Sequence, residues 1–171
     1  MVAVAWAVAT RGLETLLLCM SNRFEAGSGV NGASEAQEEL FRCTDLSLHG
    51  RNFKAWPLQD DGCAGVLSYG VSILRLGQDY GYMFLPGNQR PRIDVYSTTV
   101  PNFNKTAAST AAVRLTQSRI DSLIKVGAQY EVCILSALGC GMYGHPVDNT
   151  VSMFHKAIEK YGKGGRFIFA I

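Results

Sequence analysis

The sequence predicts an α/β fold in which helices cover both faces of a mixed central sheet, giving a three-layer α/β/α arrangement. Short apolar runs of strand length alternate along the chain with segments whose apolar residues recur at helical spacing. Two glycine-rich segments each stand between a predicted strand and a predicted helix. With 171 residues, of which 47% are hydrophobic, the chain is long enough for one core and short for two. We therefore expect residues 1–171 to form a single domain.

The first part of the chain predicts two strands and a helix. Residues 1–10, MVAVAWAVAT, are apolar, too short to cross a bilayer and without the basic start of a secretory signal, so we predict a buried strand there. Residues 16–20 predict a second strand. Farther on, Ser34 and Gln37 stand at the spacing of a capping box, which predicts a helix over Glu35–Cys43.

The middle of the chain is predicted to be mostly β. Residues 45–65 mix polar residues with glycine and proline and indicate irregular connections. Residues 70–76 and 80–85 are short β-prone runs, which predict a hairpin or two adjacent edge strands. Residues 93–99 alternate between apolar and polar side chains and are bounded by prolines, as a strand should be.

The last part predicts two helices and two strands. Residues 116–129 carry apolar side chains at helical spacing. Residues 132–137 are continuously apolar, the pattern of a central strand covered on both faces. Pro146 suits a first helical turn, and residues 147–161 keep helical phase until a run of glycines. A final strand is predicted over residues 166–171.

Charge and cysteine content narrow the possible partners and compartment. The formal charge of +2 comes from scattered residues, so we expect neither sequence-specific nucleic-acid binding nor a membrane partner. Five cysteines, an odd number without a C-x-x-C pair, favour a reducing compartment, the cytoplasm or the nucleus. No His/Cys spacing resembles a zinc site, and we expect no metal or cofactor.

The two glycine-rich segments predict a binding site for a phosphate-bearing ligand. They read GSGVNGASEAQEE over residues 27–39 and GCGMYG over residues 139–144. Glycine lets backbone N–H groups approach an anion, and a helix N-terminus adds further donors. Ligands of open α/β sheets collect beyond the carboxyl ends of the strands, so both segments are expected to face one ligand. Glu38 and Glu39 point about 100° apart on a helix and border such a ligand from neighbouring directions.

These segments resemble those of the macrodomain family, and within it the microbial poly(ADP-ribose) glycohydrolases. That group carries a glycine triplet, a short spacer and Gln-Glu-Glu, and later a Gly-Cys-Gly followed by an apolar and an aromatic residue. The matching residues here are Gly27, Ser28, Gly29, then Gln37, Glu38, Glu39, and later Gly139, Cys140, Gly141, Met142, Tyr143. The resemblance extends from about residue 16 to the C-terminus and implies a macrodomain-like fold. Two departures bear on substrate preference, because Ser28 replaces the middle glycine and Leu138 stands where many relatives have tryptophan.

The resemblance implies hydrolysis of the ribose–ribose O-glycosidic bond of poly(ADP-ribose), with release of ADP-ribose. By position, Glu39 would be the general acid and then the base that activates water, and Glu38 would hold ribose hydroxyls. The expected partners are ADP-ribose, its polymer and ADP-ribosylated proteins. The residues expected to bind the substrate are Asn22, Gly27, Ser28, Gly29, Val30, Gln37, Gly139, Cys140, Gly141, Met142, Tyr143 and Gly144.

Simpler interpretations stay open beside this one. Paired glutamates early in a helix often form a solvated face, and Asn22 is as well suited to a turn as to a ribose contact. Cys140 is explained better as a small residue that presents its backbone than as a nucleophile. His145 is interpreted as a helix-entry residue. At the level of function, the alternatives are a macrodomain that binds ADP-ribose without cutting it, and a hydrolase of mono-ADP-ribose.

Overall fold

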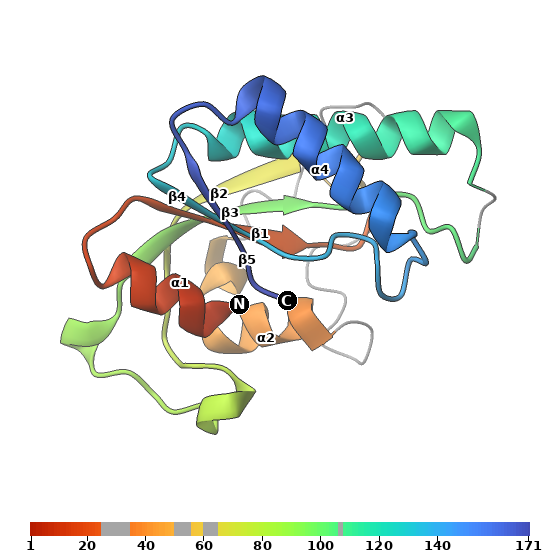
Figure 1. The fold of residues 1–171 in the computed structure, drawn as a ribbon. Helices are drawn as coiled ribbons and strands as arrows, with labels where there is room; N and C mark the ends of the chain where they lie inside the picture. The colour runs from red at the N-terminus through yellow and green to blue at the C-terminus, as the bar shows by residue number, and fades with distance from the viewer. Residues whose placement is uncertain (25–34, 50–55, 60–64, 106–107) are drawn as a thin grey trace.

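A mixed β-sheet forms the centre of the molecule (Figure 1). The computed structural model describes residues 1–24, 35–49, 56–59, 65–105 and 108–171, without the side chains of 35–38. Within these ranges the sheet has five strands in the order β2-β3-β1-β4-β5. The strands are β1 (Thr15–Met20), β2 (Gly65–Ser72), β3 (Arg92–Thr98), β4 (Val132–Leu135) and β5 (Arg166–Phe169).

The directions of the strands bring most of the loops of interest to one edge of the sheet. Strand β1 runs parallel to both β3 and β4, and β5 runs parallel to β4. Among the strands of the described ranges, only the outer strand β2 is antiparallel to its neighbour, β3. The carboxyl ends of β1, β3, β4 and β5 therefore share one edge, which is where ligands of open α/β sheets bind.

Helices cover both faces of the sheet, as predicted (Figure 1). They are α1 (Val2–Ala9), α2 (Glu35–Cys43), α3 (Thr110–Gly127) and α4 (Val147–Tyr161). In Figure 1, α1 and α2 lie on one side of the sheet and α3 and α4 on the other. The predicted three-layer α/β/α architecture is confirmed. No helix in the described ranges is long and apolar enough to cross a membrane.

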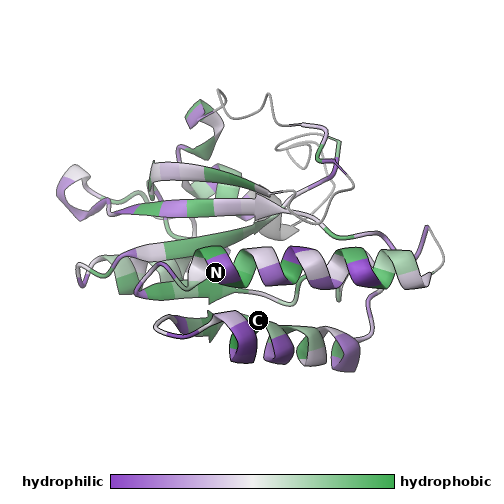
Figure 2. Ribbon diagram, turned by 90° about the horizontal axis from the view of Figure 1, so that it is seen from above, coloured by the Kyte–Doolittle hydropathy of each residue, from purple (hydrophilic) through white to green (hydrophobic). Residues whose placement is uncertain are grey.

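The side chains of β1 point alternately to the two faces of the sheet and divide the core into two halves. Leu17 and Cys19 belong to a buried cluster with α1 and α2, whereas Leu16 and Leu18 belong to a second cluster with α3 and α4. Successive side chains of a strand point to opposite faces, so an apolar run such as TLLLCM fills both layers. Figure 2, seen from the side of α3 and α4, shows polar and apolar residues alternating along both helices, as expected for helices with one face on the sheet.

The N-terminal prediction was wrong, because Val2–Ala9 is a helix and not a buried strand. This run is apolar all round and carries no period, so its pattern does not distinguish a buried helix from a buried strand. Four of its eight residues are alanine, the best helix former, and Val2 and Ala5 are buried against the sheet. Gly12, at φ +79°, then turns the chain into β1.

Other boundaries shifted for local reasons. Strand β2 begins at Gly65, inside the segment predicted to be irregular, and the predicted runs at 70–76 and 80–85 meet only through one bridge, between Arg75 and Phe84. Helix α3 begins at Thr110 instead of residue 116, because the Ser109 side chain caps it by accepting a hydrogen bond from Ala112 N. The predicted bounds of α2 and α4 are confirmed.

Candidate functional site

The site is built from the loops that leave the carboxyl edge of the sheet. Residues 99–105 follow β3 and residues 136–146 follow β4, two strands that flank β1. Helices α3 and α4 begin at this edge in Figure 1. Their N-terminal turns carry backbone N–H groups without intrahelical partners, which favours anionic ligands here.

The 139–144 loop is a compact turn with a left-handed residue at each end. Gly139 has φ +83° and Gly144 has φ +67°, a region that glycine enters without steric cost. The carbonyl of Gly139 accepts from His145 N at 3.0 Å, and that of Gly141 accepts from Gly144 N at 3.0 Å. The loop therefore closes on its own backbone.

Three consecutive N–H groups of this loop have no acceptor. Within the described part of the chain, nothing accepts a hydrogen bond from the backbone N–H of Gly141, Met142 or Tyr143. Met142 is 64% exposed, so this stretch is open to solvent. Successive backbone N–H groups in a turn form a concave site for an anion such as a phosphate. Binding of a phosphate at this turn, predicted from the glycine-rich sequence, stays a prediction.

The loop after β3 is bonded to the loop after β4. Phe103 N donates to the carbonyl of Tyr143 at 2.8 Å. The side-chain Nδ2 of Asn104 donates to the carbonyl of Met142 at 3.0 Å. Both bonds use carbonyls of the 139–144 loop and leave the N–H groups of Gly141, Met142 and Tyr143 without an acceptor.

His145 ties the same two loops from inside. Its side chain is 4% exposed, it stacks on Phe103 with ring centroids 3.8 Å apart, and its Nε2 lies 2.7 Å from the carbonyl of Pro101. Because a carbonyl only accepts, Nε2 carries the proton and donates it. His145 does precede α4, but its interpretation as a simple helix-entry residue misses this buried role.

Because His145 is buried, the stability of the folded protein should depend on pH. Burial lowers the pKa of the His145 imidazole, partly opposed by the bond to the Pro101 carbonyl. The unfolded chain then binds a proton more readily, so stability is full above the ordinary histidine pKa of about 6.5 and falls as the pH drops through it. We therefore expect the urea concentration at the unfolding midpoint of the wild type to decrease when the pH is lowered from about 7.5 to about 5.5.

The matched variants for this pH experiment are His145→Phe and His155→Gln. His155 lies on α4 with its side chain 71% exposed. His145→Phe should flatten the pH dependence of the urea midpoint, and His155→Gln should leave it as in the wild type. An equal slope in the wild type and His145→Phe would contradict the assignment.

Glu39 lies in the middle of α2 and faces a turn that follows β2. Its Oε1 accepts from Gln78 N at 3.3 Å. Gly77 passes so close that a Cβ there would overlap this carboxylate oxygen. Burial, followed by the Glu39 charge, raises the pKa of the neighbouring Cys43 thiol to about 11. Within the described residues, no hydrogen bond joins Glu39 to the 139–144 loop.

Known structures share this arrangement of elements, although sequence comparison finds nothing. No family model and no curated protein matches the sequence. Poly(ADP-ribose) glycohydrolase from Deinococcus radiodurans in complex with ADP-ribose superposes with a TM-score of 0.72 at 17% identity, over 98% of this chain and 71% of that one. The Thermomonospora curvata enzyme bound to the inhibitor ADP-HPD gives 0.76 at 20% identity, over 98% and 70%. The chain has the fold of the microbial poly(ADP-ribose) glycohydrolases.

Part of the predicted site lies outside the residues that the structure describes. The predicted motif residues concerned are Gly27, Ser28, Gly29 and Val30, together with Ser34, the predicted capping residue. The side chains of Gln37 and Glu38 are also outside the description. Their predicted roles remain predictions.

At the end of β1, Asn22 makes the contacts of a turn residue. Its Oδ1 accepts from Phe24 N at 2.9 Å, and its backbone carbonyl accepts from the indole Nε1 of Trp56 at 2.9 Å. Trp56 was not singled out in the sequence, although an isolated tryptophan in a polar segment is a signal of an anchoring contact. These bonds position the chain where it leaves β1 toward the glycine-rich segment.

The four cysteines that the structure describes, Cys19, Cys43, Cys133 and Cys140, do not form a nucleophilic site. Burial raises the pKa of the Cys19 thiol and raises that of Cys133 to about 12, so both stay protonated. Cys140 is partly exposed, and its Sγ lies 4.0 Å from the carbonyl of Leu138. The backbone of Cys140, between two glycines, remains its main contribution to the loop.

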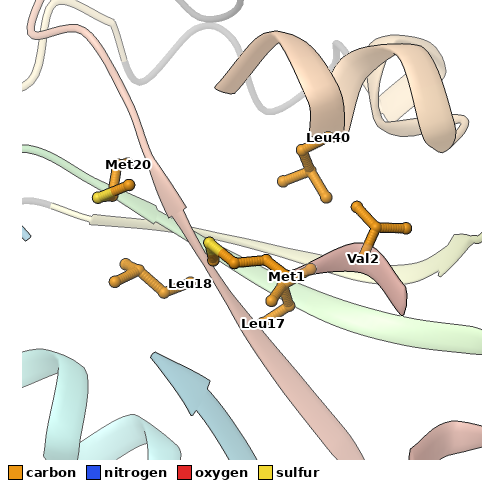
Figure 3. Close-up of a pocket in the computed structure, with 6 residues that line it drawn as sticks. All are labelled: Met1, Val2, Leu17, Leu18, Met20 and Leu40. Carbon is orange, nitrogen blue, oxygen red and sulfur yellow. The ribbon is translucent and has the colours of Figure 1, made fainter. Parts of the chain in front are cut away.

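Two cavities in the described part of the chain lie away from the 139–144 loop. A gap of about 10 Å³ between the sheet, α1 and α2 (Figure 3) has room for one water at most. It is lined by Met1, Val2, Leu17, Leu18, Met20 and Leu40. An open hollow of about 400 Å³ lies by the starts of β1 and β3, at the opposite edge, with Tyr69, Arg92 and Tyr130 in its wall. Neither space contains a predicted substrate residue.

Proposed function

We propose that this protein is an ADP-ribosyl glycohydrolase that cleaves the ribose–ribose O-glycosidic bond of poly(ADP-ribose) and releases ADP-ribose, with residues 1–171 as one catalytic domain. The observation that carries the proposal is the row of three unpaired N–H groups from Gly141 to Tyr143, at the edge of the sheet where ligands bind. A diphosphate offers the acceptors that such a row needs. Known glycohydrolases with this fold have been crystallised in complex with ADP-ribose and with the inhibitor ADP-HPD.

In this proposal the substrate diphosphate lies on the 139–144 loop. Gly139 and Gly144 shape the turn, and the N–H groups of Gly141, Met142 and Tyr143 donate to phosphate oxygens. Cys140 supports the turn, because its backbone N–H donates to the Ala137 carbonyl at 3.0 Å. The Tyr143 ring lies beside the sugar or base. Asn22 and the segment with Gly27, Ser28, Gly29, Val30 and Gln37 complete the substrate contacts.

Glu39 supplies the acid and base chemistry. Its protonated carboxyl gives a proton to the leaving ribose oxygen as the glycosidic C–O bond breaks and an oxocarbenium-like centre develops. The resulting carboxylate takes a proton from water, and the water oxygen bonds to the anomeric carbon, so the acid is restored. Glu38 holds ribose hydroxyls. Because Gln78 N donates to Oε1 of Glu39, the turn after β2 holds this carboxyl group in one orientation.

The experiment that tests this function offers three compounds, two substrates and one binding control, to the purified protein. They are poly(ADP-ribose), a protein carrying mono-ADP-ribose, and ADP-ribose itself as a binding control, with released ADP-ribose identified by mass spectrometry. Release from the polymer is the expected result. Release only from the mono-modified protein would establish the alternative hydrolase, and binding without any release would establish a non-catalytic ADP-ribose-binding macrodomain.

Gly77→Ala tests the support that the turn gives to Glu39. The added methyl group would overlap the Glu39 carboxylate, so the side chain must move, while the backbone at Gly77, with φ −72°, accepts alanine. We expect turnover to fall at least about tenfold with stability within about 1 kcal/mol of the wild type. Steady-state release of ADP-ribose and urea unfolding measure the two effects.

Gly87→Ala is the matched control for that variant. Gly87 opens the 3-10 turn η4 (Gly87–Gln89), and a Cβ there would meet no atom within 4 Å. Its turnover should equal that of the wild type. Unchanged turnover in Gly77→Ala would show that the turn does not hold the acid.

A further inference from the structure

The carbonyl groups of the 139–144 loop determine where its N–H groups point. In a planar trans peptide, the carbonyl of one residue and the N–H of the next point in opposite directions. The carbonyl of Met142 therefore sets the direction of the Tyr143 N–H, and the carbonyl of Gly141 sets that of the Met142 N–H. Each carbonyl has a partner, Asn104 Nδ2 for Met142 and Gly144 N for Gly141, both at 3.0 Å.

One of these partners is a side chain from a different loop. Asn104 is exposed and follows β3, and its backbone N donates to Oδ1 of Asn102 at 3.0 Å, which forms a turn around it. Gly144 packs so tightly on the Asn104 amide group that a Cβ at Gly144 would overlap it. The Asn104 side chain is therefore held against the outer side of the anion-binding turn.

We propose that Asn104 is a positioning residue that aims the Tyr143 N–H at the ligand diphosphate, an inference that rests on the proposed function of the 139–144 loop. Asn104 touches the outer side of the loop through the Met142 carbonyl and acts on the ligand through the peptide group that it orients. His145 supports it from the other side, because its bond to Pro101 and its stacking on Phe103 hold the loop that carries Asn104.

The variant Asn104→Ala removes the donor to Met142 without opening the core. Loss of one hydrogen bond that orients a binding group should raise the Kd for ADP-ribose, and the KM for the polymer, by about three- to tenfold. Because the Glu39 chemistry is untouched, kcat at saturation should stay within about twofold of the wild type. The melting temperature should not change, since the side chain is exposed.

A ligand-free measurement accompanies the binding assay. In ¹⁵N relaxation spectra, the amides of Met142 and Tyr143 should be ordered in the wild type and mobile in Asn104→Ala. The control is Asn88→Ala, an exposed asparagine in η4 (Gly87–Gln89), which should match the wild type in both measurements.

The outcomes separate the two claims. Mobile amides with weakened ADP-ribose binding support the positioning role. Mobile amides in a protein whose wild type does not bind ADP-ribose support the contact's orienting effect and overturn the proposed function. Amides that stay ordered in Asn104→Ala, or a fall in kcat with an unchanged KM, overturn the inference.

Discussion

Glu39→Gln is expected to abolish release of ADP-ribose while leaving its binding intact. Glutamine has the same shape and keeps an oxygen that accepts from Gln78 N, so the helix and the turn after β2 should not move. It carries no acidic proton for the leaving ribose oxygen and no carboxylate for water. General acid–base catalysis contributes about 10² to 10⁴ in rate, and turnover should fall by at least that factor.

The measurement compares kcat on poly(ADP-ribose) with the calorimetric Kd for ADP-ribose. The Kd should stay within about threefold of the wild type, because only the transition state needs the proton. Glu159→Gln serves as a control, since Glu159 is an exposed carboxylate on α4 beside His155. Retained turnover in Glu39→Gln would remove Glu39 from the mechanism.

Gly139→Ala should deform the 139–144 turn, which we propose binds the diphosphate, and weaken ADP-ribose binding at least about tenfold. Gly139 has φ +83°, which costs alanine about 1–2 kcal/mol. An added Cβ would also lie 2.7 Å from the His145 ring and 2.9 Å from a Val100 methyl group. Overpacking of this kind costs about 1–3 kcal/mol more.

Gly12→Ala separates the two causes. Gly12 has nearly the same backbone conformation, φ +79°, but a Cβ there would meet no atom within 4 Å. In urea unfolding, the free energy of unfolding of Gly12→Ala should decrease only by the cost of the left-handed φ, about 1–2 kcal/mol. Its ADP-ribose affinity should match the wild type. An equal loss of stability in both variants would show that the contact between Gly139 and His145 is loose.

The sequence predicted those elements whose signals are local. Helix α2 agrees with its predicted bounds, Glu35–Cys43, and α4 begins after Pro146 as expected. The continuous apolar run of β4 was assigned to the sheet interior, and β4 is buried throughout, between β1 and β5. Periodicity and helix-start residues act within a few positions of the chain, so they are visible without the fold.

The errors and omissions come from long-range contacts. Val2–Ala9 carries no helical period, so only its alanine content and its packing against the sheet, which depends on the rest of the chain, favour a helix over a strand. Arg119 is 2% exposed and donates to the carbonyls of Thr99, at 2.7 Å, and Gln59, at 2.6 Å. These partners are 20 and 60 positions away in the sequence. An arginine on a helical face gives no sign of such a role before the fold is known.

The turn at residues 139–144 was predictable from the sequence, but the residues that support it were not. The GCGMYG segment predicted an anion-binding turn, since glycine allows both left-handed ends of the loop. Asn104 and His145 were not predicted to brace that turn, because hydrogen bonds to backbone carbonyls of another loop leave no trace in composition or spacing. Glu39 was carried over by resemblance, and its contact with Gln78 emerged only with the structure.

The central claim is that the N–H groups of Gly141, Met142 and Tyr143 bind the diphosphate of ADP-ribose. An ADP-ribose titration followed by ¹⁵N–¹H NMR tests it directly. Downfield shifts of these three amides that saturate with the ligand, with the amides of β4 little changed, are the predicted result. If ADP-ribose saturates the protein and these three amides do not shift, or if it does not bind at all, the claim is contradicted.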